Sequence, residues 1–123
     1  MRAFTALLLL TAFVFAGEIT AYYNKNCNCC EKYFSKLERE GFKLKKVSIS
    51  PQELMEVKER LKVPVELRSC HTMVYEGRFI EGHVKPEGVR KAIKNKSIRG
   101  VASMHGIRSG RGEYEEEYKV VRR

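Results

Sequence analysis

The sequence contains no aspartate and no tryptophan, and it has a single glutamine, Gln52. All 15 of its acidic side chains are therefore glutamates. Calcium loops of the EF-hand type, Ser-His-Asp triads and the Mg²⁺ sites of P-loop NTPases all depend on aspartate, so these classes are excluded. A chain of 123 residues with 43% hydrophobic and 32% charged side chains is expected to fold as one soluble domain and is too short for two.

The longest apolar run lies at the start of the chain, from Ala3 to Ala16. It is too short to span a bilayer comfortably, but it has the length of a signal-peptide core, and Ala16 is the small residue expected before a cleavage site. We therefore expect residues 1–16 to be a signal peptide and the mature protein, from about Gly17, to be periplasmic or secreted. An uncleaved N-terminal anchor is the alternative, and the domain is exported in either case.

The chain is basic, with 24 lysines and arginines and a formal net charge of +9. These residues are spread along the chain and interleave with glutamate, for example in residues 36–40 and 56–60, which indicates solvated helix faces. An exported protein without an aromatic-basic motif is not expected to bind nucleic acid. Contact with a membrane is expected only through an uncleaved signal segment or weak attraction to anionic lipid.

The pattern of apolar residues and turn signals predicts an α/β fold in the order βαβα followed by ββα. The apolar spacing after the first cysteines indicates a helix that begins at the cysteine cluster and ends at Gly41. The sequence Ser-Pro-Gln-Glu at 50–53 is a capping box that opens a second helix, with Leu54, Val57 and Leu61 as its buried stripe. The other expected elements are strands at 18–23 and 42–49, a hairpin at 72–81 and a third helix from Pro86.

This order of elements is the core of a thioredoxin-like fold, with a mixed four-stranded sheet flanked by helices. We assign residues 17–98 to this domain and residues 99–123 to a glycine-rich, charged tail, which is mobile or partner-dependent and has a last strand at 118–121. In such a fold the loop before the hairpin faces the cysteine helix, at the place that a cis-proline normally occupies. Cys70 and His71 stand at that place, and the end of the hairpin brings His83 to the same edge.

All four cysteines fall into two clusters, at residues 27–30 (Cys-Asn-Cys-Cys) and at residues 70–71 (Cys-His). An even number of cysteines in an exported protein is compatible with two structural disulfides. Three cysteines within four residues would, however, close only very small loops, and neighbouring cysteines can pair only through a strained ring. Structural disulfides alone therefore explain the pattern poorly.

A second interpretation takes Cys27 and Cys30 as a CxxC redox pair, in which Cys27 attacks and Cys30 resolves. The N-terminus of a helix lowers the pKa of a thiol and so favours this chemistry. The protein would then be a thiol oxidoreductase. This interpretation leaves Cys29, Cys70 and His71 without a role.

A third interpretation uses both clusters as a metal site with soft thiolates from two segments and one imidazole. Such ligands suit Cu(I) or Zn(II), and bridging sulfurs would allow more than one copper ion. Closed zinc sites more often use two separated CxxC pairs, or one pair with distant histidines, so copper is favoured over zinc. The candidate ligands are Cys27, Cys29, Cys30, Cys70 and His71.

The two cysteine motifs and the sequence Glu-Gly-His-Val at 81–84 resemble the CopG-type periplasmic copper-resistance family over residues 22–98. The resemblance implies a thioredoxin-like fold, copper bound by both cysteine motifs, and a role in copper handling that includes redox activity towards copper. The expected partners are copper ions and another periplasmic copper or redox protein. Carried over by position, the ligands are Cys27, Cys29, Cys30, Cys70 and His71.

The chain departs from the family pattern at residues 103–106, which read Ser-Met-His-Gly where the family has a Pro-Gly-Met-Pro-like segment. Met104 and His105 are further candidate donors for copper, and exposed side chains without a role are the alternative for both. His83 is a candidate ligand, a partner that supports a ligand, or a helix-capping residue. The expected function is Cu(I) binding in copper resistance, with a CxxC oxidoreductase and a zinc-binding protein as alternatives.

Overall fold

The computed structural model describes residues 17–104 and 112–123. The predicted signal peptide, residues 1–16, and the candidate donor His105 lie outside these residues. In the part of the chain that is described, no helix has both the length and the apolar character needed to cross a membrane.

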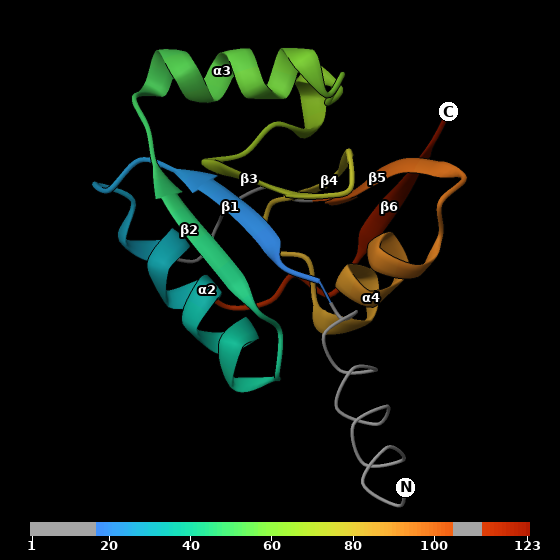
Figure 1. The fold of residues 1–123 in the computed structure, drawn as a ribbon, viewed down its shortest axis with the longest axis horizontal. Helices are drawn as coiled ribbons and strands as arrows, with labels where there is room; N and C mark the ends of the chain where they lie inside the picture. The colour runs from blue at the N-terminus through green and yellow to red at the C-terminus, as the bar shows by residue number, and fades with distance from the viewer. Residues whose placement is uncertain (1–16, 105–111) are drawn as a thin grey trace, which may run out of the picture.

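The described elements confirm the predicted βαβα-ββα order and add two strands after it, as Figure 1 shows. The predicted last strand is also confirmed, at the C-terminal end of the chain. The elements are β1 (Ile19–Tyr23), α2 (Asn28–Arg39), β2 (Leu44–Ser48), α3 (Pro51–Arg60), the 3-10 turn η1 (Val65–Leu67), β3 (His71–Tyr75), β4 (Arg78–Glu81), α4 (Pro86–Lys94), β5 (Ile98–Ser103) and β6 (Tyr118–Arg122).

The strands form one mixed sheet in the order β2-β1-β3-β4-β5-β6. β1 pairs with β2 and β4 pairs with β5 in parallel, whereas the other neighbours are antiparallel. Helix α3 covers one face of the sheet, and α2 and α4 lie on the other face (Figure 1). The protein is therefore a layered α/β domain. β1, which leads into the first cysteine motif, and β3, which follows Cys70, are neighbours in its sheet.

The prediction of a four-stranded sheet was wrong, because the described sheet has six strands. The glycines after residue 98 suggested a tail, but Gly100 is a buried residue of β5. A Cβ atom at this position would lie 2.5 Å from the carbonyl oxygen and the ring of Phe79 on β4. Glycine is used here because two strands and an aromatic ring come together closely, and the chain continues through β5 into the sheet.

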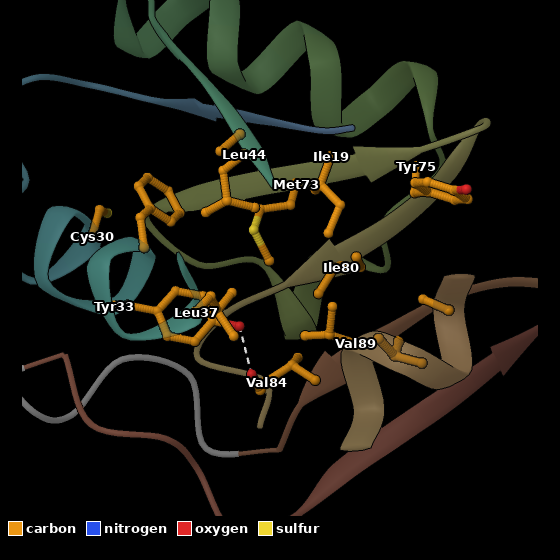
Figure 2. Close-up of a cluster of buried hydrophobic side chains, with 14 of the residues drawn as sticks. Ile19, Cys30, Tyr33, Leu37, Leu44, Met73, Tyr75, Ile80, Val84 and Val89 are labelled. Atoms are coloured by element: carbon orange, nitrogen blue, oxygen red, sulfur yellow. Dashed lines mark hydrogen bonds between the residues drawn. The ribbon is translucent and has the colours of Figure 1, made fainter. Parts of the chain in front are cut away.

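Helix α2 is attached to the sheet by one buried face. Its buried residues recur at the helical spacing i, i+3, i+4 and i+7, and they pack on side chains of β1, β3 and β4 (Figure 2). The buried residues of α2 are Cys30, Tyr33, Phe34 and Leu37. Because Cys30 belongs to this face, the core fixes the position of the helix N-terminus and of the cysteines around it.

The second face of the sheet carries a smaller apolar cluster formed by Val63, Phe79 and Ala102. The predicted stripe of α3 is only partly confirmed, because Leu54 is buried but Val57 and Leu61 are half-buried. The residue of α3 that points most fully into the protein besides Leu54 is Lys58, which is 3% exposed. Lys58 lies within residues 56–60, which were expected to form a solvated helix face, and for this residue that prediction is wrong.

The predicted capping box is present at the start of α3, and its contribution to stability can be measured. The amide of Glu53 donates to Ser50 Oγ at 3.1 Å, and the amide of Ser50 donates to Glu53 Oε1 at 3.0 Å. We expect Ser50→Ala to lower the free energy of unfolding by about 1 kcal/mol, measured by urea denaturation. The exposed neighbour Gln52 is the control, and Gln52→Ala should stay within about 0.5 kcal/mol of the parent protein. Equal effects of the two substitutions would contradict this role of the cap.

Candidate metal centre

Three cysteines meet at the N-terminus of α2. The sulfur atoms of Cys27, Cys29 and Cys30 all lie within 4.8 Å of one another, which makes them a group that could hold a metal ion. Cys27 is the N-cap of the helix and forms a disulfide with Cys30. Cys29 is a free thiol, and its sulfur lies 3.6 Å from that of Cys27. The structure thus combines a closed CxxC pair with a third sulfur beside it.

The loop that carries the cysteines is held by Asn24 at the end of β1. Its carbonyl oxygen accepts from the amide of Cys27 at 2.8 Å, and its side-chain amide donates to the carbonyl of Ile49 at 3.1 Å. Asn24 Oδ1 also accepts from the amide of Asn26 at 3.0 Å. These bonds explain why the polar sequence Asn-Lys-Asn makes an ordered turn that directs Cys27 to the start of the helix.

His71, the first residue of β3, lies against this cysteine cluster and is fully buried. Its Nε2 is 3.1 Å from the carbonyl oxygen of Gly82, and its Nδ1 is 3.3 Å from the sulfur of Cys30. A carbonyl only accepts hydrogen bonds, so the proton of the neutral ring is on Nε2 and the lone pair of Nδ1 is directed at the sulfur. Metal-binding histidines have this arrangement, with one nitrogen held by a protein oxygen and the other free to ligate.

Burial holds the imidazole of His71 in its neutral form. Burial, and after it the neighbouring His83 and Lys58, lowers the pKa of His71 to about 3. A neutral ring keeps a lone pair available for a metal ion over the whole physiological pH range.

His83 belongs to a group of stacked rings behind His71. The ring of Tyr33 lies 5.3 Å from that of His71 and 4.9 Å from that of His83, and the two imidazoles are 5.7 Å apart. His83 Nδ1 lies 3.0 Å from the carbonyl oxygen of Glu113 and so carries the proton, whereas its buried Nε2 has no hydrogen-bond partner among the described residues. Burial lowers the pKa of His83 as well. The rings of His71, His83 and Tyr33 are thus in mutual contact, and His83 keeps one buried nitrogen without a partner among the described residues.

Cys70 is exposed, unlike His71 beside it. It shares with Cys27 the wall of a pocket of about 390 Å³ between the loop before α2 and helix α3. Burial, and after it the nearby Cys70 thiol, raises the pKa of Cys29. The structure therefore brings the two cysteine motifs to the same place, with Cys70 on the solvent side and Cys30 on the core side. The other residues of the pocket are Asn24, Asn26, Pro51, Leu54, Met55, Lys58 and Ser69.

Two candidate copper donors remain, Met104 and His105. Met104 follows β5 and its side chain is 44% exposed, and its amide donates to the carbonyl of Glu117 at 3.1 Å. His105 lies outside the described residues.

Sequence reasoning missed the part of the site that comes from the C-terminal segment. A Cβ atom on Gly112 would lie 2.6 Å from the amide nitrogen of Tyr33 and 2.8 Å from the carbonyl oxygen of Cys29, so this residue packs directly on the first turns of α2. Tyr114 follows it with its ring edge against Tyr33, at 6.0 Å. The only signal in the sequence was the glycine at position 112. It was interpreted as part of a mobile tail, whereas it marks a close approach of the chain to helix α2.

Fold and site together define a mixed α/β protein with a cysteine triad that could bind a metal ion. A family model described as "Protein of unknown function, DUF411" matches residues 67–105. The chain is similar to the solved structure "Copper resistance protein copG- Form 1", with 31% sequence identity and a TM-score of 0.67, over 83% of this chain and 81% of that one. For "Copper resistance protein copG- Form 2" the identity is 32% and the TM-score 0.69, over 84% and 85%.

The chain belongs to the CopG copper resistance family. The resemblance seen in the cysteine motifs is therefore confirmed. No curated protein matches the chain.

The lowered pKa of His71 makes the stability of the metal-free protein depend on pH. In the unfolded chain the ring takes up a proton below about pH 6.5, whereas in the folded protein it does so only near pH 3. The stabilisation is thus present above pH 6.5 and is lost as the pH falls towards 3, by about 1.4 kcal/mol for each pH unit. We expect His71→Gln to flatten the fall in the free energy of unfolding between pH 6.5 and 4. If the free energy of unfolding falls equally with pH in the parent and in His71→Gln, the lowered pKa of His71 is contradicted.

Proposed function

We propose that this protein is an exported, thioredoxin-like protein that binds Cu(I) and acts in copper resistance. One observation carries the proposal. Three cysteine sulfurs lie within 4.8 Å of one another, and the free nitrogen of a buried, neutral histidine is directed at one of them. Thiolates and imidazole in a partly buried place are the ligands that Cu(I) prefers.

The proposed ligands are the five residues of the two motifs. Cys29 offers a free thiol, and the disulfide between Cys27 and Cys30 has to be reduced before these two sulfurs can bind a metal as thiolates. Cys70 supplies a sulfur from the solvent side, and His71 supplies Nδ1 from the core side. Three sulfurs within 4.8 Å of one another, with Cys70 on the wall of the same pocket as Cys27, favour more than one Cu(I), because sulfur bridges copper ions. Zinc is the less favoured metal for the same ligands.

Family membership supports copper as the metal, because both matched structures carry the name of a copper resistance protein. The order of elements and the cysteines at the start of the first helix support the thioredoxin-like assignment, with β5 and β6 as an extension of the sheet. No cis peptide bond occurs in residues 17–104 and 112–123, and the sequence Cys-His stands where that fold normally presents its cis-proline. The apolar run of residues 3–16 supports export to the periplasm.

A CxxC thiol oxidoreductase is the second candidate function, and the disulfide between Cys27 and Cys30 favours it. Cys30 is fully buried and Cys27 is half-buried beside the pocket, so a partner thiolate would reach Cys27. Attack of a partner thiolate on the Cys27 sulfur would form a mixed disulfide and release the Cys30 thiolate. The second thiolate of the partner would then attack the partner sulfur of the mixed disulfide, which forms the partner's own disulfide and releases the Cys27 thiolate. In this exchange the Cys27–Cys30 pair gains two electrons and the partner dithiol loses two.

Metal titration of the protein from Gly17 onward tests the copper proposal. We expect the reduced protein to retain stoichiometric Cu(I) against a competing chelator and to release Zn(II), measured by elemental analysis without oxygen. Oxidised protein should bind much less copper, because two of its sulfurs are closed in the disulfide. Zinc held as tightly as copper would contradict the choice of metal.

Cys29→Ser separates the two functions, because only the metal site needs this sulfur. We expect the substitution to lower the Cu(I) affinity by more than about 100-fold while the oxidation of a dithiol partner by the Cys27–Cys30 disulfide continues. Gln52→Ala, at an exposed residue outside the site, serves as the control, and its Cu(I) affinity should equal that of the parent. Full copper binding by Cys29→Ser would show that the proposed site is wrong.

A further inference from the structure

An ion pair is buried beneath the Cys-His motif. Lys58 of α3 and Glu81 at the end of β4 form it, and their exposures are 3% and 0%. Neither residue belongs to the proposed ligands. A buried ion pair seldom stabilises a fold more than apolar residues of the same size would, so its presence at this place calls for an explanation other than stability.

Every hydrogen-bonding atom of the two charged groups is used. The ammonium of Lys58 has three donors, and it contacts the carbonyl oxygen of His71 at 3.1 Å, Thr72 Oγ1 at 2.7 Å and the Glu81 carboxylate. The carboxylate in turn accepts from the amide of Ser69 and the hydroxyl of Thr72, each at 2.7 Å, and the hydroxyl of Ser69 lies 3.1 Å from it. The network is complete without water.

All of these contacts end on one short stretch of chain, residues 69–72. Glu81 holds the backbone on one side of Cys70, through the amide of Ser69, and Lys58 holds it on the other side, through the carbonyl of His71. The residue after Glu81 holds the imidazole, because the carbonyl oxygen of Gly82 fixes Nε2 of His71. The end of β4 and one lysine of α3 thus determine where the Cys70 and His71 side chains are presented.

We propose that Lys58 and Glu81 are positioning residues of the copper site, which hold residues 69–72 so that Cys70 and His71 face the cysteines of α2. The inference rests on the proposed function, because it concerns the ligands of that site. It adds that a metal centre at the N-terminus of α2 depends on an ion pair on the opposite face of the sheet. Neither side chain is a proposed ligand, and Lys58 lines the same pocket as Cys27 and Cys70.

The test uses two single variants and one double variant. Lys58→Met removes the ammonium and keeps the rest of the side-chain length, and Glu81→Gln removes the charge and keeps the shape. Each single variant leaves one buried charge without its partner, so Lys58→Met combined with Glu81→Gln is included to avoid this penalty. Lys46→Met is the matched control, because Lys46 forms an exposed ion pair with Glu38, at 3.2 Å, away from the Cys-His motif.

Two measurements are made on each reduced protein. The first is the Cu(I) affinity against a chelator, which we expect to fall about 10- to 100-fold in the double variant and to stay at the parent value in Lys46→Met. The second is amide hydrogen exchange of the metal-free protein, which we expect to accelerate in residues 69–72 and to stay unchanged in α2. A general loss of stability would instead accelerate exchange in both segments.

A double-mutant cycle shows whether the ion pair acts through the motif. In a protein that already contains Cys70→Ser and His71→Gln, the added Lys58→Met should cost little further copper affinity, because the ligands that it positions are gone. Three outcomes would each overturn the inference. Lys58→Met could cost the same copper affinity in both backgrounds, the folded double variant could bind copper as tightly as the parent, or hydrogen exchange of residues 69–72 could be unchanged. Failure of the parent protein to retain copper would instead overturn the proposed function, so the two failures are distinguishable.

Discussion

The packing of α2 on the sheet is the constraint on which the rest of the structure depends. Tyr33, Phe34 and Leu37 are fully buried against β1, β3 and β4, and each such side chain contributes about 1.5 to 3 kcal/mol through the apolar area that it removes from water. Cys30 lies on the same face of the helix. The hydrophobic core therefore sets the position of the thiols, and no additional structural element is needed to hold a reactive group at this place.

Tyr33 connects the core to the polar part of the site. Its hydroxyl donates to the carbonyl oxygen of Val84, as Figure 2 shows, and its ring stacks on both imidazoles. The ring of His71 is thus held on one side by an aromatic face and at its edge by the carbonyl of Gly82. In the proposed copper site, a ring that is fixed in this way would lose little conformational entropy on binding a metal ion, which favours affinity.

Local signals explain which parts of the structure the sequence could predict. The capping box at Ser50, the spacing of Tyr33 and Leu37, and the turn signals of the hairpin act over a few residues, and the elements that they predict are present. Lys58 and Gly100 were misread because their roles depend on neighbours far along the chain. Lys58 is buried because Glu81, from a distant strand, forms an ion pair with it. Gly100 is needed because the ring and backbone of Phe79 lie against it.

The contact of Gly112 with the first turns of α2 has a consequence for the order in which the protein is completed. A chain that emerges with its N-terminus first presents Cys27, Cys29 and Cys30 early, whereas the residues that close against them arrive almost last. Long-range contacts of this kind form slowly. Thiols that are presented before this last segment arrives are open to oxidation, so the disulfide between Cys27 and Cys30 can close before the fold is complete.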